Sequence, residues 1–167
     1  MKVSQKAVDL MNRQIGNEFS SMIQYFAIAN RFDRETLPEL NAHFSNLAER
    51  KKENALRYMD QATGKENSLT IPTIPAPKVQ FDSTEEAVKF SLEKEIEEIE
   101  RVNAIMRAVK EDSDQATRQF VEELSAEQEE EVLLMRELLG TVQKAGENNL
   151  LLVEDFLIRK TSVAVEV

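Results

Sequence analysis

The sequence predicts an all-α fold, a four-helix bundle followed by a short fifth helix. Long stretches repeat apolar residues every three or four positions, which is the period of an amphipathic helix. The chain has only four glycines and four prolines, and three of the prolines fall in residues 63–82. That segment has no helical period and separates two pairs of predicted helices. We expect residues 1–167 to form one domain.

The first two helices are expected over about residues 4–32 and 38–62. Pro38 suits the first turn of the second helix, and Gly64 follows its end as a stop signal. The apolar stripe of the first helix advances by threes and fours. Its members are Val8, Met11, Ile15, Phe19, Met22, Phe26 and Ala29.

We expect residues 63–82 to form a long crossover connection between the second and third helices. A long segment without regular structure is unusual inside a compact domain. It is long enough to run the length of a bundle, which makes the helices on either side parallel. The third helix, about residues 83–111, opens with Ser83 and Glu86 at the spacing of a capping box.

The fourth helix is expected over about residues 114–145. Asp112, Ser113 and Asp114 supply cap chemistry before it, and Gly146 ends it. A last apolar segment predicts the short fifth helix over about residues 148–160.

The composition excludes several classes of function. There is no cysteine, so neither a disulfide nor a thiolate metal site is possible, and the single histidine, His43, rules out a site with two imidazoles. The net charge of -10 predicts no nucleic-acid partner and makes cations the more natural ligands. No apolar run approaches the roughly 18 residues that span a membrane. The N-terminus lacks an apolar signal core, so we expect a cytoplasmic protein without a membrane partner.

Acidic side chains fall inside the apolar stripes. Glu95 lies mid-stripe on the third helix, between Leu92 and Ile99. Glu127 and Glu131 lie mid-stripe on the fourth helix, with Gln128 at its edge. On the first helix Glu18 borders the stripe, and Tyr25 follows two turns later on the same side. A buried carboxylate must be protonated, paired or bound to a metal, and inward carboxylates of a bundle commonly bind two iron or manganese ions.

The second helix breaks this pattern. Lys51 occupies the centre of its stripe and Asn54 follows one turn later, whereas Glu49 and Glu53 point away. A di-metal site would favour Glu-x-x-His here. A charged lysine offers donors and no lone pair, so it repels a metal and attracts carboxylates. We therefore expect Lys51 to be charged and within salt-bridge reach of Glu18, Glu95 or Glu131.

The chain resembles the bacterial and archaeal ferritins over nearly its whole length. The resemblance is carried by the segments NRQIGNEFSSMIQY, FSLEKEIEEI, ELSAEQEEEV and GENNLLLVEDFLIRK, of which the Ala-Glu-Gln-x-Glu-Glu run in the third is the most specific. It implies iron as the ligand and a homo-oligomeric hollow shell, commonly of 24 subunits, that stores ferric oxide mineral. We expect no organic cofactor.

The resemblance also implies roles for individual residues. Glu18, Glu95 and Glu131 match iron ligands of the ferroxidase centre. Tyr25 and Gln128 match the auxiliary tyrosine and glutamine beside it.

A third iron site and its alterations follow from the same matching. Glu127 and Glu130 match acids of the third iron site, and Arg50 replaces another acid of that site. Lys51 stands where the family has its bridging glutamate, and Asn54 where it has a histidine ligand. The resemblance thus implies ferroxidase activity, and these departures place that activity in doubt.

Three functions remain open. The first is an iron-storage subunit with weak or lost ferroxidase activity and iron absent from the di-iron position, assembled alone or with other ferritin subunits. The second is an active ferroxidase in which the helix over residues 38–62 turns to bring Glu49 or Glu53 inward. The third is a metal-free structural relative in which Lys51 and Arg50 pair with the acid cluster. An oxygenase of the same bundle class would lack the same ligands.

Overall fold

The computed structural model describes residues 3–63, 68–112 and 115–165. These residues form five α-helices and one 3-10 turn, and no strand occurs among them. The elements are α1 (Gln5–Arg34), α2 (Pro38–Thr63), α3 (Thr84–Asp112), α4 (Gln115–Ala145), η1 (Glu147–Asn149) and α5 (Leu150–Val165). The all-α prediction with a short fifth helix is confirmed.

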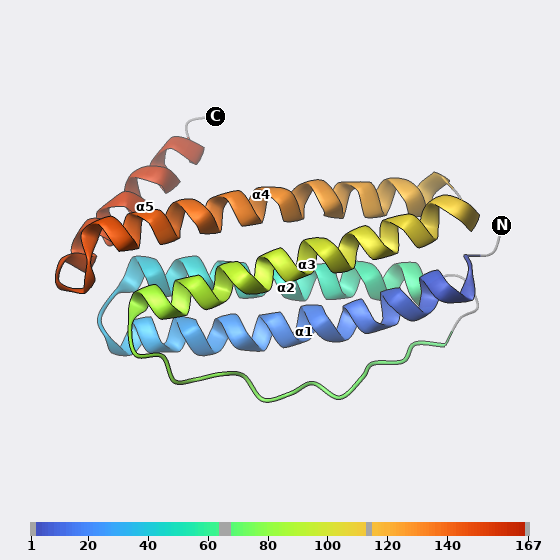
Figure 1. Ribbon diagram of the computed structural model, residues 1–167, viewed down its shortest axis with the longest axis horizontal. Coiled ribbons are helices and arrows are strands. Elements are labelled where there is room, and N and C mark those ends of the chain that lie inside the picture. The colour runs from blue at the N-terminus through green and yellow to red at the C-terminus, as the bar shows by residue number, and fades with distance from the viewer. Residues whose placement is uncertain (1–2, 64–67, 113–114, 166–167) are drawn as a thin grey trace.

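The bundle consists of two helical hairpins. α1 packs mainly on α2, which makes the first hairpin, and α3 packs mainly on α4, which makes the second. Residues 68–82, the described part of the crossover, run along the outside of α1 to the start of α3, and α5 projects from the end where α4 stops (Figure 1). Because of the crossover, α2 and α3 run in the same direction, as predicted.

Local chemistry fixes the helix ends. The Ser4 hydroxyl accepts a hydrogen bond from the Ala7 backbone N–H at 3.2 Å and caps α1. The Ser83 hydroxyl accepts one from the Glu86 N–H at 3.0 Å and caps α3, as the spacing predicted. Gly146 ends α4 with φ 74°, a left-handed conformation that glycine adopts at little cost. The predicted signals at Gly64, Ser113 and Asp114 lie outside the described residues.

The crossover is fastened to α1 at intervals. Gln24 exchanges two hydrogen bonds of 2.8 Å with the backbone of Lys78, and the Asn12 amide donates to the Ser68 carbonyl at 3.2 Å. Between these points Gly16 faces Pro72 so closely that an added Cβ would lie 2.5 Å from the proline ring. The described part of the crossover, residues 68–82, is therefore held against α1, and we call it the strap.

Two apolar clusters fill the bundle, one toward each end. The cluster near α5 includes Phe32, Phe44 and Leu138. The other cluster includes Met11 and Ile105. Several buried polar or charged side chains belong to neither cluster, and Glu18, Lys51, Glu95, Glu98 and Gln128 are among them. We call these five the polar layer.

The structure corrects the predicted stripes at single positions. On α1 Phe26 is 39% exposed whereas Tyr25 is fully buried. On α3 Ile99 is only half-buried whereas Glu98 is buried. α5 also extends to Val165, beyond the predicted end at residue 160.

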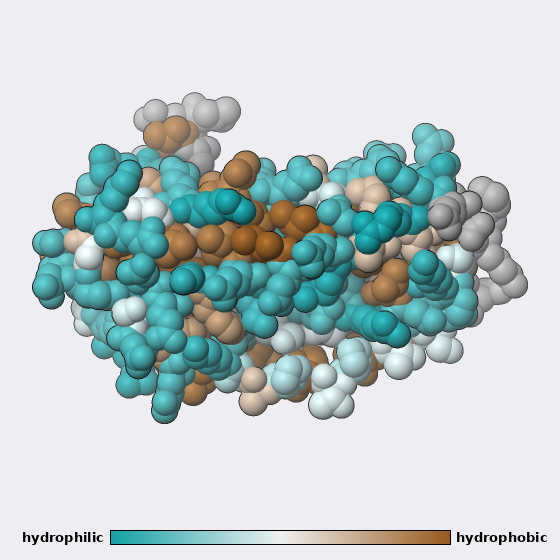
Figure 2. Space-filling model, viewed as in Figure 1, coloured by the Kyte–Doolittle hydropathy of each residue, from teal (hydrophilic) through white to brown (hydrophobic). Residues whose placement is uncertain are grey.

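The surface is mostly polar. Figure 2 shows hydrophilic side chains over much of one face, with an apolar strip where α3 and α4 adjoin. No helix of the described chain is long and apolar enough to cross a membrane.

Candidate functional site

The centre of the polar layer is an ion pair between the two hairpins. Lys51 on α2 places its ammonium nitrogen 2.9 Å from Oε2 of Glu95 on α3, and the two side chains are 2% and 1% exposed. The ammonium also donates to Oε1 of Gln128 at 3.4 Å. The prediction that Lys51 reaches one of the inward acids is confirmed.

Both carboxylate oxygens of Glu95 accept hydrogen bonds. The Gln128 amide donates to its Oε2 at 2.7 Å and to its backbone carbonyl at 2.9 Å. The Tyr25 hydroxyl donates to its Oε1. The carboxylate therefore accepts hydrogen bonds from α1, α2 and α4 together.

Electrostatics keep Lys51 charged in spite of its burial. Burial lowers the pKa of the ammonium, but the carboxylates of Glu95, Glu18 and Glu98 together raise that pKa above its usual value. The amine therefore carries a proton at neutral pH, as the sequence predicted.

A second acid contact lies beside the ion pair. The Gln14 amide nitrogen donates to Oε1 of Glu18 at 3.0 Å and to Oε1 of Glu98. Burial, and then the charge of Glu98, raise the pKa of Glu18 well above its usual value. Burial opposes ionisation of Glu98 too, but its hydrogen bond with Glu18 and the charges of Lys51 and Arg101 leave its pKa lowered.

Sequence reasoning missed Glu98. It follows Glu95 by three positions, a spacing that keeps two residues on one helix face. The apolar periodicity of the third helix instead favours its neighbour Ile99 as the inward residue, because Ile99 is apolar and Glu98 is charged. Arg101, one turn further on, binds Oε2 of Glu98 through two nitrogens at 2.8 and 3.2 Å.

The acids of α4 lie elsewhere than expected. Gln128, predicted at the stripe edge, is 5% exposed and lies at the centre. Glu127, predicted mid-stripe, has a side chain 53% exposed and pairs with Arg57 at 2.9 Å. Glu130 is exposed as well. The mid-stripe placement of Glu127 is wrong, because its neighbour Gln128 is the residue that faces inward.

Glu131 is the one partly buried acid of this α4 group. Its side chain is 19% exposed and pairs with Arg50 at 3.0 Å. Burial raises its pKa, and the charge of Arg50 opposes the rise. Asn54 is half-buried, and its side-chain oxygen accepts from Arg57 at 3.2 Å. Both residues line a pocket of about 380 Å³ between α2 and α4.

Comparison with known proteins identifies the family. The family model of the ferritin-like domain matches residues 8–145. The chain belongs to the ferritin family. It is 34% identical to Ferritin BfrB of Mycobacterium tuberculosis over an alignment of 155 residues. That alignment covers 93% of this chain and 85% of the relative. It is 25% identical over 161 residues to the bacterial non-heme ferritin of Staphylococcus epidermidis, covering 95% and 97%.

Solved ferritin structures share the fold. An open-pore ferritin from Archaeoglobus fulgidus superposes with a TM-score of 0.86 at 23% identity and covers 93% of this chain and 98% of that one. A humanized archaeal ferritin gives a TM-score of 0.87 at 23% identity, covering 93% and 96%. Membership in the ferritin family implies that the chain binds and stores iron.

The side chains at the ferritin di-metal position do not fit a pair of metal ions. The Lys51 ammonium lies where the ferritin resemblance puts the bridging carboxylate, and the oxygen of Asn54 accepts a hydrogen bond from Arg57. Across the described ranges, no three carboxylate or imidazole groups come together in a way that could hold a metal ion. The ligand roles of Glu18, Glu95, Glu127, Glu130 and Glu131 stay predictions, as do the auxiliary roles of Tyr25 and Gln128.

Proposed function

We propose that this chain is an iron-storage subunit whose ferroxidase activity is weak or lost, because the Lys51 ammonium takes the place of a bridging carboxylate. One observation carries the proposal: Lys51 Nζ lies 2.9 Å from Glu95 Oε2 with both side chains buried. A carboxylate there would offer two oxygens to a pair of cations. The ammonium brings a positive charge and no lone pair.

Two arginines support the same reading at the acids of α4, one of the ferroxidase centre and one of the third iron site. Arg50 pairs with Glu131, and Arg57 pairs with Glu127. Each guanidinium neutralises an acid that the ferritin resemblance assigns to iron. Iron is then cargo, held by a homo-oligomeric shell formed by this chain alone or with other ferritin subunits.

The double variant Lys51→Glu with Asn54→His tests the proposal by restoring the ferritin ligand types. We expect it to oxidise ferrous iron rapidly, whereas the wild type oxidises it at nearly the rate without protein. Stopped-flow absorbance with ferrous iron and oxygen measures both. The control Lys52→Glu with Asn46→His makes the same changes at two exposed positions of α2 and should behave as the wild type.

Rapid oxidation by the wild type would overturn the proposal, provided that Glu18→Ala and Glu131→Ala abolish it. That result would also favour the active-ferroxidase alternative. In the described arrangement Glu49 is 52% exposed and pairs with Lys52, and Glu53 is exposed too. Bringing either acid inward requires α2 to rotate and to move Lys51 out of the core.

A metal-free structural protein is the second candidate, because the Lys51–Glu95 pair satisfies the buried charges without a metal. Iron loading separates it from a storage subunit. The assembled protein is exposed to ferrous iron in air and then passed through a gel-filtration column. Iron that co-elutes with the protein well above the amount expected for surface binding supports storage. Iron-free protein after loading supports the metal-free candidate.

A further inference from the structure

Two buried carboxylates share one hydrogen-bond donor between α1 and α3. Glu18 is 3% and Glu98 is 2% exposed, and the Gln14 amide nitrogen donates to Oε1 of each. The other oxygen of Glu18, Oε2, is buried and has no hydrogen-bond partner. A buried acceptor without a partner costs free energy, so this oxygen is available for a ligand.

A second unpartnered oxygen lies nearby on α2. The Tyr58 side chain is fully buried, and its hydroxyl has no hydrogen-bond partner. Burial raises the pKa of this phenol, and the charges of Glu18 and Glu98 raise it further. The hydroxyl therefore lies in the field of the same two acids, although it belongs to a different helix.

A pocket leads from the surface to two of these four residues, Glu18 and Tyr58. The pocket between α2 and α4 is lined at once by exposed Glu127 and Glu130 and by buried Glu18 and Tyr58. Its volume of about 380 Å³ far exceeds the roughly 10–15 Å³ that is needed to hold one water molecule. A hydrated cation can enter from the acidic rim.

We propose that Glu18, Glu98, Gln14 and Tyr58 form a site for a single hard divalent cation, such as Mn²⁺ or Fe²⁺, separate from the position that Lys51 fills. Carboxylate, amide and phenol oxygens suit such ions. Gln14 joins the site by turning its amide, so that the oxygen replaces the nitrogen between the acids. Glu98 lies three residues beyond Glu95, so the site is about one turn further along α3.

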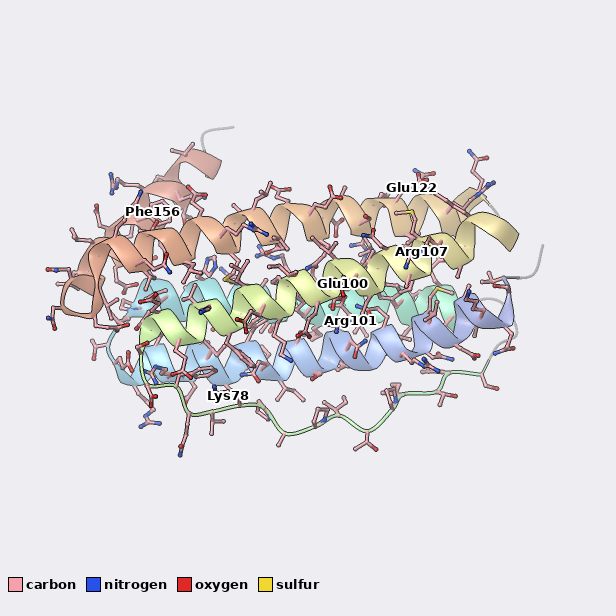
Figure 3. The ribbon with its side chains drawn as sticks, viewed as in Figure 1. Lys78, Glu100, Arg101, Arg107, Glu122 and Phe156 are labelled. Carbon is pink, nitrogen blue, oxygen red and sulfur yellow. The ribbon has the colours of Figure 1, made fainter. Side chains whose placement is uncertain are left out.

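Two cationic side chains limit the site to one ion. Lys51 acts electrostatically on both Glu18 and Glu98, and Arg101 pairs with Glu98 at 2.8 Å. Arg101 is 34% exposed, so it can swing away from Glu98 into solvent; Figure 3 labels it on α3 beside Glu100 near mid-length of the bundle. Lys51 is buried and paired with Glu95, so it stays in the core. Its repulsion of the bound cation therefore limits the affinity of the site.

Anomalous X-ray scattering from crystals of the assembled protein soaked in Mn²⁺ tests the proposal. We expect a manganese peak between Glu18 and Glu98 in the wild type and in the control Glu100→Gln, which changes an exposed acid two positions away. The peak should be absent from Glu98→Gln and weakened in Tyr58→Phe. Manganese bound only at exposed carboxylates such as Glu127 would overturn the proposal, as would a peak that persists in Glu98→Gln.

Tyrosine fluorescence gives an independent readout in solution. The chain has two tyrosines and no tryptophan, so paramagnetic Mn²⁺ bound beside Tyr58 should quench emission that Tyr58→Phe lacks. In Lys51→Gln the Mn²⁺ concentration that gives half-maximal quenching should fall roughly tenfold, because the substitution removes a nearby positive charge. Equal quenching in the wild type and in folded Glu98→Gln would contradict the site. None of these readouts depends on iron storage or oxidation, so failure here leaves the proposed function standing.

Discussion

Lys51 and Glu95 form a buried ion pair whose net contribution to stability is small but whose loss is costly. Taking two charges out of water costs several kcal/mol per ion, about what their attraction and hydrogen bonds return. Glu95 is bonded by Tyr25, Gln128 and Lys51 together. Removing the ammonium alone leaves a buried carboxylate with two neutral donors.

We expect Lys51→Ala to lower the free energy of unfolding by roughly 3–5 kcal/mol. The matched control is Lys52→Ala, which removes a lysine that is 48% exposed and paired with exposed Glu49; it should change stability by less than about 0.5 kcal/mol. Urea unfolding followed by circular dichroism measures both at neutral pH. Equal effects of the two substitutions would show that the Lys51 charge is not needed in the core.

His43 makes stability depend on pH. Burial, and then the charges of Arg50 and Lys160, lower its pKa from 6.5 to about 4. Between those values the unfolded chain binds a proton that the folded chain does not, so the stability due to this residue falls as pH drops from 6.5 to about 4. His43→Gln cannot titrate, so its stability should fall less over this interval in thermal melts. Identical pH profiles would contradict the lowered pKa.

The sequence predicted only some of the residues in the polar layer. Lys51 and Glu95 were found because a charge in the middle of an apolar stripe stands out. Glu98 and Gln128 were misjudged, because each lies one position from a residue that seemed the better inward candidate. One residue corresponds to about 100° of helix rotation, so a small phase error exchanges a buried side chain for an exposed one. The choice of Glu95 over Glu131 as the partner of Lys51 depends on packing between helices, which a stripe does not encode.

At the scale of elements, the strap depends on the absence of a side chain at Gly16. Glycine in a helix is normally unfavourable by about 1 kcal/mol relative to alanine. Here the proline ring of Pro72 occupies the space that a Cβ would need. The strap therefore lies close to α1 at that point.

We expect Gly16→Ala to lower stability by about 1–3 kcal/mol, because the added methyl overpacks a rigid proline ring. Gly140→Ala is the matched control: Gly140 also lies in a helix, but outside its own stretch of helix nothing lies within 4 Å of its added Cβ. It should raise stability by up to about 1 kcal/mol through helix propensity. Thermal unfolding of both variants gives the comparison. A Gly16→Ala protein as stable as the wild type would mean that the strap yields easily.

The elements themselves were largely predictable. Apolar periodicity, the Ser83 cap and Gly146 marked helix positions, since each acts through the local backbone. The length of α5 was underestimated, because residues 161–163 near its end are exposed and carry no inward apolar stripe. What holds α5 is a distant contact: the Glu154 carboxylate accepts hydrogen bonds from the N–H groups of Glu39 and Leu40 at 3.1 and 2.8 Å. No local sequence signal reveals such a contact.

At the scale of the whole molecule, the surface leaves apolar side chains uncovered. On α5 Leu151 is 76%, Leu152 60% and Val163 66% exposed, and Leu133 on α4 is 66% exposed. Exposed apolar patches commonly mark surfaces that bind other proteins. An isolated subunit would carry them at a cost in solubility.

We expect the chain to form a large closed oligomer at neutral pH, with these side chains at contacts between subunits. Analytical ultracentrifugation at micromolar concentration measures the assembly. Leu151→Glu with Leu152→Glu should shift the distribution toward small species, whereas the control Glu129→Gln, an exposed change on α4, should not. Only monomers or dimers in the wild type would count decisively against a shell.

The polar layer has a mechanical consequence. Its contacts join one hairpin to the other: Tyr25 and Lys51 reach Glu95, and Gln14 reaches Glu98. Apolar contacts are non-directional, so two purely apolar hairpins could slide past each other by a helical turn, about 5.4 Å, and still bury much of their surface. A slide of that size would break all three polar contacts at once. Lys51 and the acids of the polar layer thus fix the register of the two hairpins along the bundle axis, whether or not the protein carries iron.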